Sequence, residues 1–156
     1  AMTTIEQIES LVKELGPAMP DIDAIVQTEE PSWAIQFSDE SILIIEPADD
    51  PSRMVVSAEL GVAAEAQQRT VYETLLCYNL MWRDSGGVKI GLAGPQGSLI
   101  ISVDVCVEGL TLMALQQELE RFLKIVRSWT QYVGKADTTD APPLPGMEAG
   151  NLHLHA

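Results

Sequence analysis

The stretch VYETLLCYNLMW (71–82), followed by the turn sequence DSGG (84–87), decides how this chain of 156 residues folds. The first segment is apolar on nearly every side, whereas a surface helix needs only one buried stripe. We therefore expect a helix over Gln68–Trp82 that is covered twice. Its own sheet would cover one side, and a second copy or a bound polypeptide would cover the other.

Two strands and a long helix are expected after this turn. Residues 88–92 alternate between apolar side chains and small or charged ones, and residues 99–107 do so over a longer run, as strands do. The outer face of the longer strand carries small or partly polar side chains. Residues 112–133 then place apolar side chains at helical spacing, which predicts the closing helix.

The first half of the chain predicts one more helix and three more strands. Thr3 and Glu6 have the spacing of a capping box, and apolar residues follow at helical spacing. Strands are expected at 33–37, 42–45 and 54–60, while residues 22–27 fit a loop or a short strand.

The order of elements, α-β-β-β-α-β-β-α, predicts an α+β fold: an antiparallel five-stranded sheet with three helices packed on it. One domain is expected over residues 1–133. The tail, 134–156, is rich in proline, which is typical of a linker or a disordered end. Because Leu152 and Leu154 alternate with histidines, we also expect Asn151–His155 to lie on an apolar groove of its own or a neighbouring copy, unless it makes only a lattice contact.

Acidic residues outnumber basic ones by 23 to 9, which gives a net charge of −14. This balance argues against nucleic acid and membrane surfaces as partners, because both attract basic patches. The charge is uneven: residues 1–70 contain 14 acidic and 3 basic residues, and residues 71–133 contain 6 and 5. We therefore expect the permanent interface in the nearly neutral second half.

The start of the chain lacks the basic and apolar segments of a signal peptide, and no apolar run approaches the length of a transmembrane helix. We therefore expect a cytoplasmic protein in a reducing compartment. Cys77 and Cys106 are then expected to be buried thiols rather than a disulfide.

No catalytic or metal-binding constellation is evident in the sequence. The only histidines, His153 and His155, lie in the tail, where a solvated end explains them better than a metal site or a catalytic triad. Glu59 and Asp104 fall in expected strands, and nothing points to a paired acid and base. We expect no enzymatic activity, no metal and no cofactor.

Apolar side chains exceed what the expected core needs. Residues 42–45 are apolar on both strand faces, and Trp33 and Trp82 are large amphipathic side chains of the kind enriched at interfaces. Each of these alone fits core packing. Together they favour a protein-binding module.

The chain resembles the class I chaperones of type III secretion, also called the Tir-chaperone-like family. LLCYNLMW (75–82) is similar to the family's leucine-rich helix that ends in Asn-Leu-x-Trp/Phe, and SGGVKIGL (85–92) is similar to the turn and strand that follow. GSLII (97–101) and the helix over Leu115–Trp129 fit as well. The resemblance extends over about residues 3–133 and does not include the tail.

This resemblance implies a homodimer without enzymatic activity in the cytoplasm of a Gram-negative bacterium. Such a chaperone binds the N-terminal region of a secreted effector in extended form and keeps it soluble and export-competent. An adaptor or regulator that binds a folded partner on the same fold is the alternative hypothesis. An enzyme with an unrecognised carboxylate site is a third.

Two sets of candidate residues follow. We predict that the effector contacts the outer face of the first helix and the first strands, at Ile5, Ile8, Trp33, Ile35, Ile42 and Ile44. The pattern leaves open whether Ile42 with Ile44 or Leu43 with Ile45 points outward, and we take the first pair. We predict the dimer interface on the 71–82 helix and the longer strand, at Tyr72, Leu76, Leu80, Ile100, Ser102 and Asp104.

Overall fold

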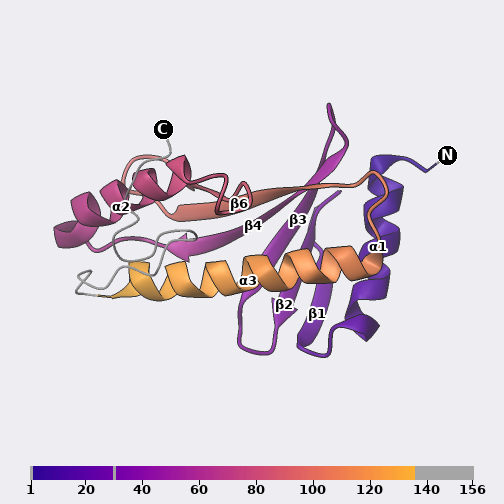
Figure 1. Ribbon diagram of the computed structural model, residues 1–156. Coiled ribbons are helices and arrows are strands. Elements are labelled where there is room, and N and C mark those ends of the chain that lie inside the picture. Colours follow the sequence, from indigo (N-terminus) through magenta and orange to yellow (C-terminus); the bar gives the residue numbers. More distant parts are fainter. Residues whose placement is uncertain (1, 30, 136–156) are drawn as a thin grey trace. The chain divides into compact units, whose positions relative to one another are not determined.

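The computed structural model describes residues 2–29 and 31–135 (Figure 1). The expectations for the tail, including the groove contact of Asn151–His155, lie outside the described residues. The elements follow one another as α1 (Thr4–Ala18), β1 (Ile22–Gln27), β2 (Trp33–Phe37), β3 (Ile42–Ala48), β4 (Arg53–Gly61), a short 3-10 helix η1 (Glu65–Gln67), α2 (Gln68–Leu80), β5 (Lys89–Leu92), β6 (Leu99–Cys106) and α3 (Leu112–Gly134).

The strands form a six-stranded sheet in the order β1-β2-β3-β4-β6-β5. The prediction of an α+β fold with three helices and an antiparallel sheet is confirmed, but the prediction of five strands is wrong because Ile22–Gln27 forms β1. This strand lies at the edge of the sheet, and its register shifts between Ile22 and Ala24. Its sequence therefore lacks the clean alternation by which the other strands are recognised.

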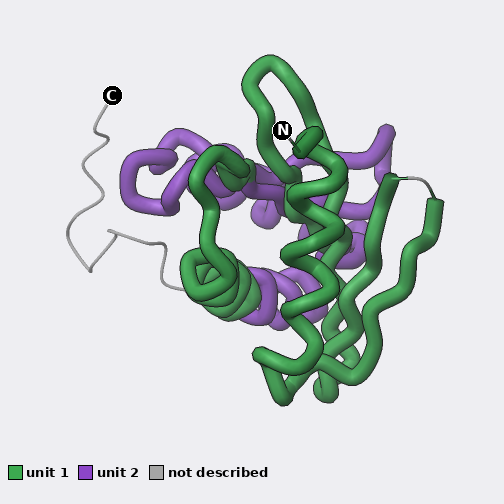
Figure 2. Tube along the Cα trace, turned by 90° about the vertical axis from the view of Figure 1, so that its right-hand side faces the viewer, with its two compact units in different colours: residues 1–58, 104–124 green, residues 59–103, 125–156 purple. Residues whose placement is uncertain are grey.

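Two structural units divide the chain, and β4, β6 and α3 each contribute to both (Figure 2). Unit 1 comprises residues 1–58 and 104–124, and unit 2 comprises residues 59–103 and 125–156. Each unit has its own buried side chains.

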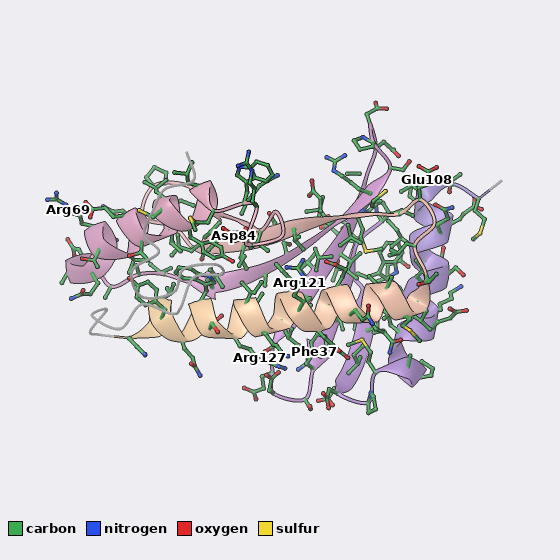
Figure 3. All side chains as sticks on the ribbon, viewed as in Figure 1. Phe37, Arg69, Asp84, Glu108, Arg121 and Arg127 are labelled. Atoms are coloured by element: carbon green, nitrogen blue, oxygen red, sulfur yellow. The ribbon has the colours of Figure 1, made fainter. Side chains whose placement is uncertain are left out.

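In unit 1, strand alternation determines which side chains are buried. Ile25, Ile35 and Leu43 lie directly opposite one another across β1, β2 and β3, and Ile35 and Leu43 are fully buried. Phe37 is buried two residues along β2 from Ile35 (Figure 3). One face of this part of the sheet is therefore the core face.

Helix α1 covers the core face of unit 1. It packs against β1 and β3, and its buried side chains are Ile8, Val12 and Leu15. The capping box predicted at its start is half present, because the Thr3 side chain accepts a hydrogen bond from the backbone N–H of Glu6 at 3.2 Å. The Gln116 side chain in α3 donates to the carbonyl oxygen of Ala18 at 3.1 Å, which joins the end of α1 to α3.

In unit 2, an aromatic cluster holds α2 against α3. The Trp129 ring makes edge contacts with Tyr78 and Tyr132, with ring centroids 4.9 Å and 5.5 Å away. The Tyr132 hydroxyl donates a hydrogen bond to Thr74 Oγ1 at 3.1 Å. All three rings are buried. Edge-to-face pairs of this kind add to the stabilisation that comes from burial alone.

Both cysteines are exposed, so the prediction of buried thiols is wrong. Cys77 lies on the side of α2 that the described chain leaves uncovered. Cys106 occupies an outward position of β6, between the buried Val105 and Val107. Alternation explains the error at Cys106, since burial of its two neighbours turns the thiol outward.

The core face gives a first testable prediction. Ile35→Ala should lower the free energy of unfolding by about 2–5 kcal/mol, because the substitution leaves a cavity in a fully buried site. Ile42→Ala is the matched control: the side chain is half exposed on the other face, so the change should stay within about 0.5 kcal/mol. Urea unfolding followed by circular dichroism measures both, and equal losses would contradict the assignment of faces.

Candidate functional site

The second face of the unit 1 sheet carries an apolar surface that the described residues leave partly uncovered. Val26, Ala34 and Ile44 lie directly opposite one another across β1, β2 and β3. Ile42 lies on the same face of β3 and is 50% exposed, and Val26 is 55% exposed. We call Val26, Ala34, Ile42 and Ile44 the outer patch.

Three of the residues predicted to bind an effector lie in the core instead. Ile8 and Ile35 are fully buried, and Trp33 is 5% exposed. Their burial leaves no side-chain surface for a partner, so we do not carry them into the proposed site. Trp33 and Ile35 are buried because alternate side chains of β2 share the core face. Ile8 is buried because it lies on the apolar stripe of α1 that packs on the sheet.

The other three predicted residues are accessible, and two of them lie together. Leu43 and Ile45 are buried while Ile42 is exposed, which confirms that Ile42 and Ile44 form the outward pair. Ile5 is 43% exposed, but it lies on α1, which covers the core face. The structure therefore places Ile5 on a different surface from the outer patch.

Beside the outer patch, β1 presents an open sheet edge. Thr28, just past the end of β1, donates its N–H to the Ser32 carbonyl oxygen. Val26, two residues before Thr28, lies opposite Ala34 of β2. Because backbone groups alternate in direction along a strand, those of Ile25 and Gln27 point away from β2. The described part of the chain offers these groups no hydrogen-bond partner.

In unit 2, α2 has an exposed apolar side as well as a buried one. Val71, Leu75 and Tyr78 are buried, whereas Leu76 is 70% exposed and Leu80 48% exposed. Trp82, just past the helix, is also exposed, as is Leu92 on β5. At the start of the helix the Arg69 side chain pairs with Glu73, one turn further along α2, at 3.0 Å (Figure 3). The expected second apolar side of this helix is therefore present and is uncovered within the described chain.

The residues predicted for a dimer interface divide between the two units. Tyr72, Leu76 and Leu80 recur at intervals of four residues on α2, which places them on one side of the helix. Ile100 and Ser102 are half-buried on β6 in unit 2. Asp104 belongs to unit 1, where its carboxylate pairs with Arg53 of the neighbouring β4 at 3.3 Å. The ion pair indicates that Asp104 lies on the solvated face of the sheet.

Two members of the outer patch were missed by the sequence prediction. Val26 lies in a segment that was not assigned to a strand, and Ala34 is too small to stand out in a hydropathy pattern. Had 22–27 been assigned as a strand, pairing it with 33–37 would have placed Val26 opposite Ala34. The information that was lacking is the pairing of β1 with β2, which can be inferred only by aligning the two segments as neighbouring strands.

Little in the described chain suggests chemistry. Residues 2–29 and 31–135 contain no cluster of three or more His, Cys, Asp or Glu side chains that could hold a metal. A pocket of about 230 Å³ opens in unit 1, lined by Met2, Gln7, Ser10, Leu11, Val107, Gly109 and Leu110. Its lining contains no ionisable side chain. Among the described helices, none combines the length and the hydropathy that a membrane span requires.

Comparison with known proteins identifies the fold and the family model that the chain matches. The model of the Tir chaperone protein (CesT) family matches residues 8–130. A comparison with curated protein sequences gives no match. Among solved structures, a chain of the ExsC–ExsE complex superposes with a TM-score of 0.70 at 16% identity, covering 87% of this chain and 100% of that one.

Two further solved structures have the same fold. A chain of the HopA1–SchA chaperone–effector complex gives a TM-score of 0.64 at 14% identity, over 84% of this chain and 98% of that one. A chain of the Yersinia pestis structure of the type III secretion chaperone SycH in complex with a stable fragment of YscM2 gives 0.55 at 15% identity, over 81% of this chain and 99% of that one.

The exposed cysteines give a second prediction. In dilute native protein both thiols should react with a disulfide reagent such as DTNB, because neither is shielded by the described chain. Cys77→Ser and Cys106→Ser variants assign the two reactions, and the same protein unfolded in guanidinium chloride gives the reference rate. A Cys106 thiol that reacts only after unfolding would contradict its placement on the surface.

Proposed function

Because the chain belongs to the Tir chaperone protein (CesT) family, we propose that it is a non-catalytic cytoplasmic chaperone for a type III secreted effector. It binds the extended N-terminal region of the effector and keeps that region soluble and competent for export. The observation that carries this proposal is the outer patch on β1, β2 and β3, an exposed apolar surface beside an open strand edge.

The solved structures of similar fold support a protein partner. The HopA1–SchA structure is a chaperone–effector complex, and the SycH structure holds a type III secretion chaperone with a fragment of YscM2. A fold of this kind is thus compatible with binding another polypeptide. The partner of the present chain is proposed to be of the same class.

The geometry at β1 suits an extended segment better than a folded surface. A strand added to an open edge gains main-chain hydrogen bonds, and its alternate side chains reach the surfaces on either side of the sheet. At β1 the free groups of Ile25 and Gln27 would supply the hydrogen bonds. Side chains on one side of the added strand would lie against Val26 and its neighbours in the outer patch. Ile5 on α1 provides a separate apolar contact.

Charge favours a basic segment as the partner. Asp21 and Glu29 flank β1, Asp23 lies within it, and all three are exposed. Complementary charge raises association rates through long-range attraction, and salt screens this effect. The acidic excess of the first half therefore assists capture of a basic effector region.

The protein is proposed to form a homodimer through α2 and β6 of unit 2. Tyr72, Leu76 and Leu80 supply the helix surface, and Ile100 and Ser102 supply small or half-buried side chains on the strand. Trp82 and Leu92 extend the exposed apolar surface of this unit. Exposed apolar patches of this kind mark interfaces more often than isolated surface residues do. Asp104, which is paired with Arg53 in unit 1, is expected at the margin.

Co-expression with the product of the neighbouring reading frame tests the proposed function. A chaperone should protect an extended segment of that product from protease and should purify as about two copies per effector. An adaptor should instead bind a folded partner. The chaperone assignment fails if this product neither binds the protein nor becomes soluble, and if other secreted proteins from the same source also fail to bind it.

Ile42→Asp tests the outer patch within that assay. A charge at this half-exposed position should weaken effector binding at least about ten-fold, because an unpaired carboxylate would have to be desolvated in the complex. Dimer formation and thermal stability should be unchanged. Met113→Asp, on the exposed side of α3, is the control and should leave binding intact. Equal binding by the two variants would remove the outer patch from the site.

Leu76→Glu tests the dimer. The side chain is 70% exposed in the single chain, so the variant should still fold, with a free energy of unfolding within about 0.5 kcal/mol of that of the wild-type monomer. In a dimer the new charge would be buried without a partner, and sedimentation equilibrium should show monomers. Met113→Glu, at 69% exposure, is the matched control and should remain dimeric. A wild type that is monomeric at micromolar concentration would contradict the proposed interface.

A further inference from the structure

The two edge strands of the sheet, β1 and β5, differ in their free backbone groups. In unit 2, β5 pairs with β6, and Ala93 just beyond it donates its N–H to the Ser98 carbonyl oxygen. Backbone groups alternate in direction along a strand, so the N–H and C=O groups of Lys89 and Gly91, like those of Ala93, point toward β6. Those of Ile90 and Leu92 point outward. An unprotected β5 would therefore expose two residues to which another strand could pair.

The Asn79 side chain occupies the outward groups of Ile90. Its Oδ1 accepts a hydrogen bond from the Ile90 N–H at 2.8 Å, and its Nδ2 donates to the Ile90 carbonyl oxygen, also at 2.8 Å. A carboxamide carries one donor side and one acceptor side, as a peptide group does. Asn79 thus supplies to Ile90 the pair of hydrogen bonds that a neighbouring strand would supply.

The local chain path brings Asn79 to this position. Asn79 lies in the last turn of α2, and the chain returns to β5 through Gly86 and Gly87, whose φ angles of 68° and 82° are in the region that favours glycine. The burial of Tyr78 against Trp129 fixes the rotation of the helix about its axis. Asn79 then projects beside β5 while Leu76 and Leu80 stay exposed.

Once Asn79 is bonded, Leu92 is the remaining residue of β5 with outward backbone groups. The described part of the chain gives these groups no partner. One residue is too little for a stable strand pairing, because adjacent hydrogen bonds along the ladder hold the register. On β1, by contrast, Ile25 and Gln27 are two successive outward positions and neither is bonded within the described chain.

We propose that Asn79 closes the β5 edge of the sheet against strand addition, so that β1 is the edge at which an extended polypeptide pairs. Natural sheets protect their edges by such local devices, because an open edge invites pairing with other chains. Here the protecting group is a side-chain amide rather than a charge or a proline. The part of this proposal that concerns an effector strand at β1 rests on the proposed function, and the closure of β5 does not.

Hydrogen exchange in the wild type is the first test. The Ile90 amide should exchange at least about ten-fold more slowly than the outward amide of Gln27 on β1, because the first is bonded to Asn79 and the second is free within the described chain. Two-dimensional NMR of the protein alone resolves these amides. Equal exchange rates would overturn the closure of β5, whatever the outcome of any effector assay.

Asn79→Ala is the second test, again on the protein alone. The variant should lose the protection of the Ile90 amide and, in sedimentation velocity over a concentration series, should form assemblies larger than those of the wild type. Adding Leu92→Pro should reverse the larger assemblies, because proline removes an outward N–H while sparing the bonds to β6. Assemblies that persist in the double variant would overturn the proposal.

Tyr132→Phe separates edge closure from simple destabilisation. This variant loses the hydrogen bond to Thr74, which also holds α2 in unit 2, but it leaves Asn79 and β5 intact. It should sediment as the wild type does and keep Ile90 protected. Larger assemblies in Tyr132→Phe would mean that loosening unit 2 is sufficient, and edge closure by Asn79 would then be rejected. If Asn79→Ala does not fold, the wild-type exchange rates still decide the proposal.

Discussion

Side-chain alternation along β2 and β3 connects the core of unit 1 to its candidate binding surface. Because successive side chains point to opposite faces, burial of Ile35 and Leu43 forces Ala34 and Ile44 onto the other face. A strand segment that is apolar at every position places apolar side chains on both faces of the sheet, and each face needs a covering element to be buried. Helix α1 covers one of them, and the other becomes the outer patch. The exposed apolar surface is thus a direct consequence of how the core is built.

The same reasoning applies to α2, with helical rather than strand geometry. The Tyr78 ring packs against Trp129, and Thr74 accepts a hydrogen bond from Tyr132. These contacts with α3 determine which side of α2 is buried. With 3.6 residues per turn, Leu76 and Leu80 then fall on the uncovered side. Each unit therefore has one apolar surface that its own described residues leave open. This division suits a protein that has a permanent partner at one unit and an exchangeable partner at the other.

Membership of the chaperone family adds a reason for such surfaces to stay open. A protein that holds another polypeptide in extended form must present apolar side chains and free backbone groups without pairing to copies of itself. The acidic excess would help here, since like charges on the chain oppose self-association and would attract the basic segment that we propose as the partner. Local closure of sheet edges would serve the same end. These features reconcile a net charge of −14 with a surface that is partly apolar.

The sequence by itself determined the helices, the principal strands, the α+β class and the family. It did so because these depend on the period of apolar residues within a short segment, as in α3, or on a local motif such as LLCYNLMW (75–82). The surplus of apolar residues was also visible, and it correctly indicated uncovered surface on α2 and on residues 42–45.

The tertiary structure alone decided which residues form the outer patch, and it added β1 to the sheet. Trp33 and Ile42 are both apolar, and only pairing with neighbouring strands assigns one to the core and the other to the surface. Cys77 was misjudged for the same reason, because its exposure depends on which side of α2 meets α3. The hydrogen bonds of Asn79 to Ile90 join residues 11 apart across a turn, and no sequence period reports such a contact. Burial and pairing are relations between segments, so a pattern within one segment does not determine them.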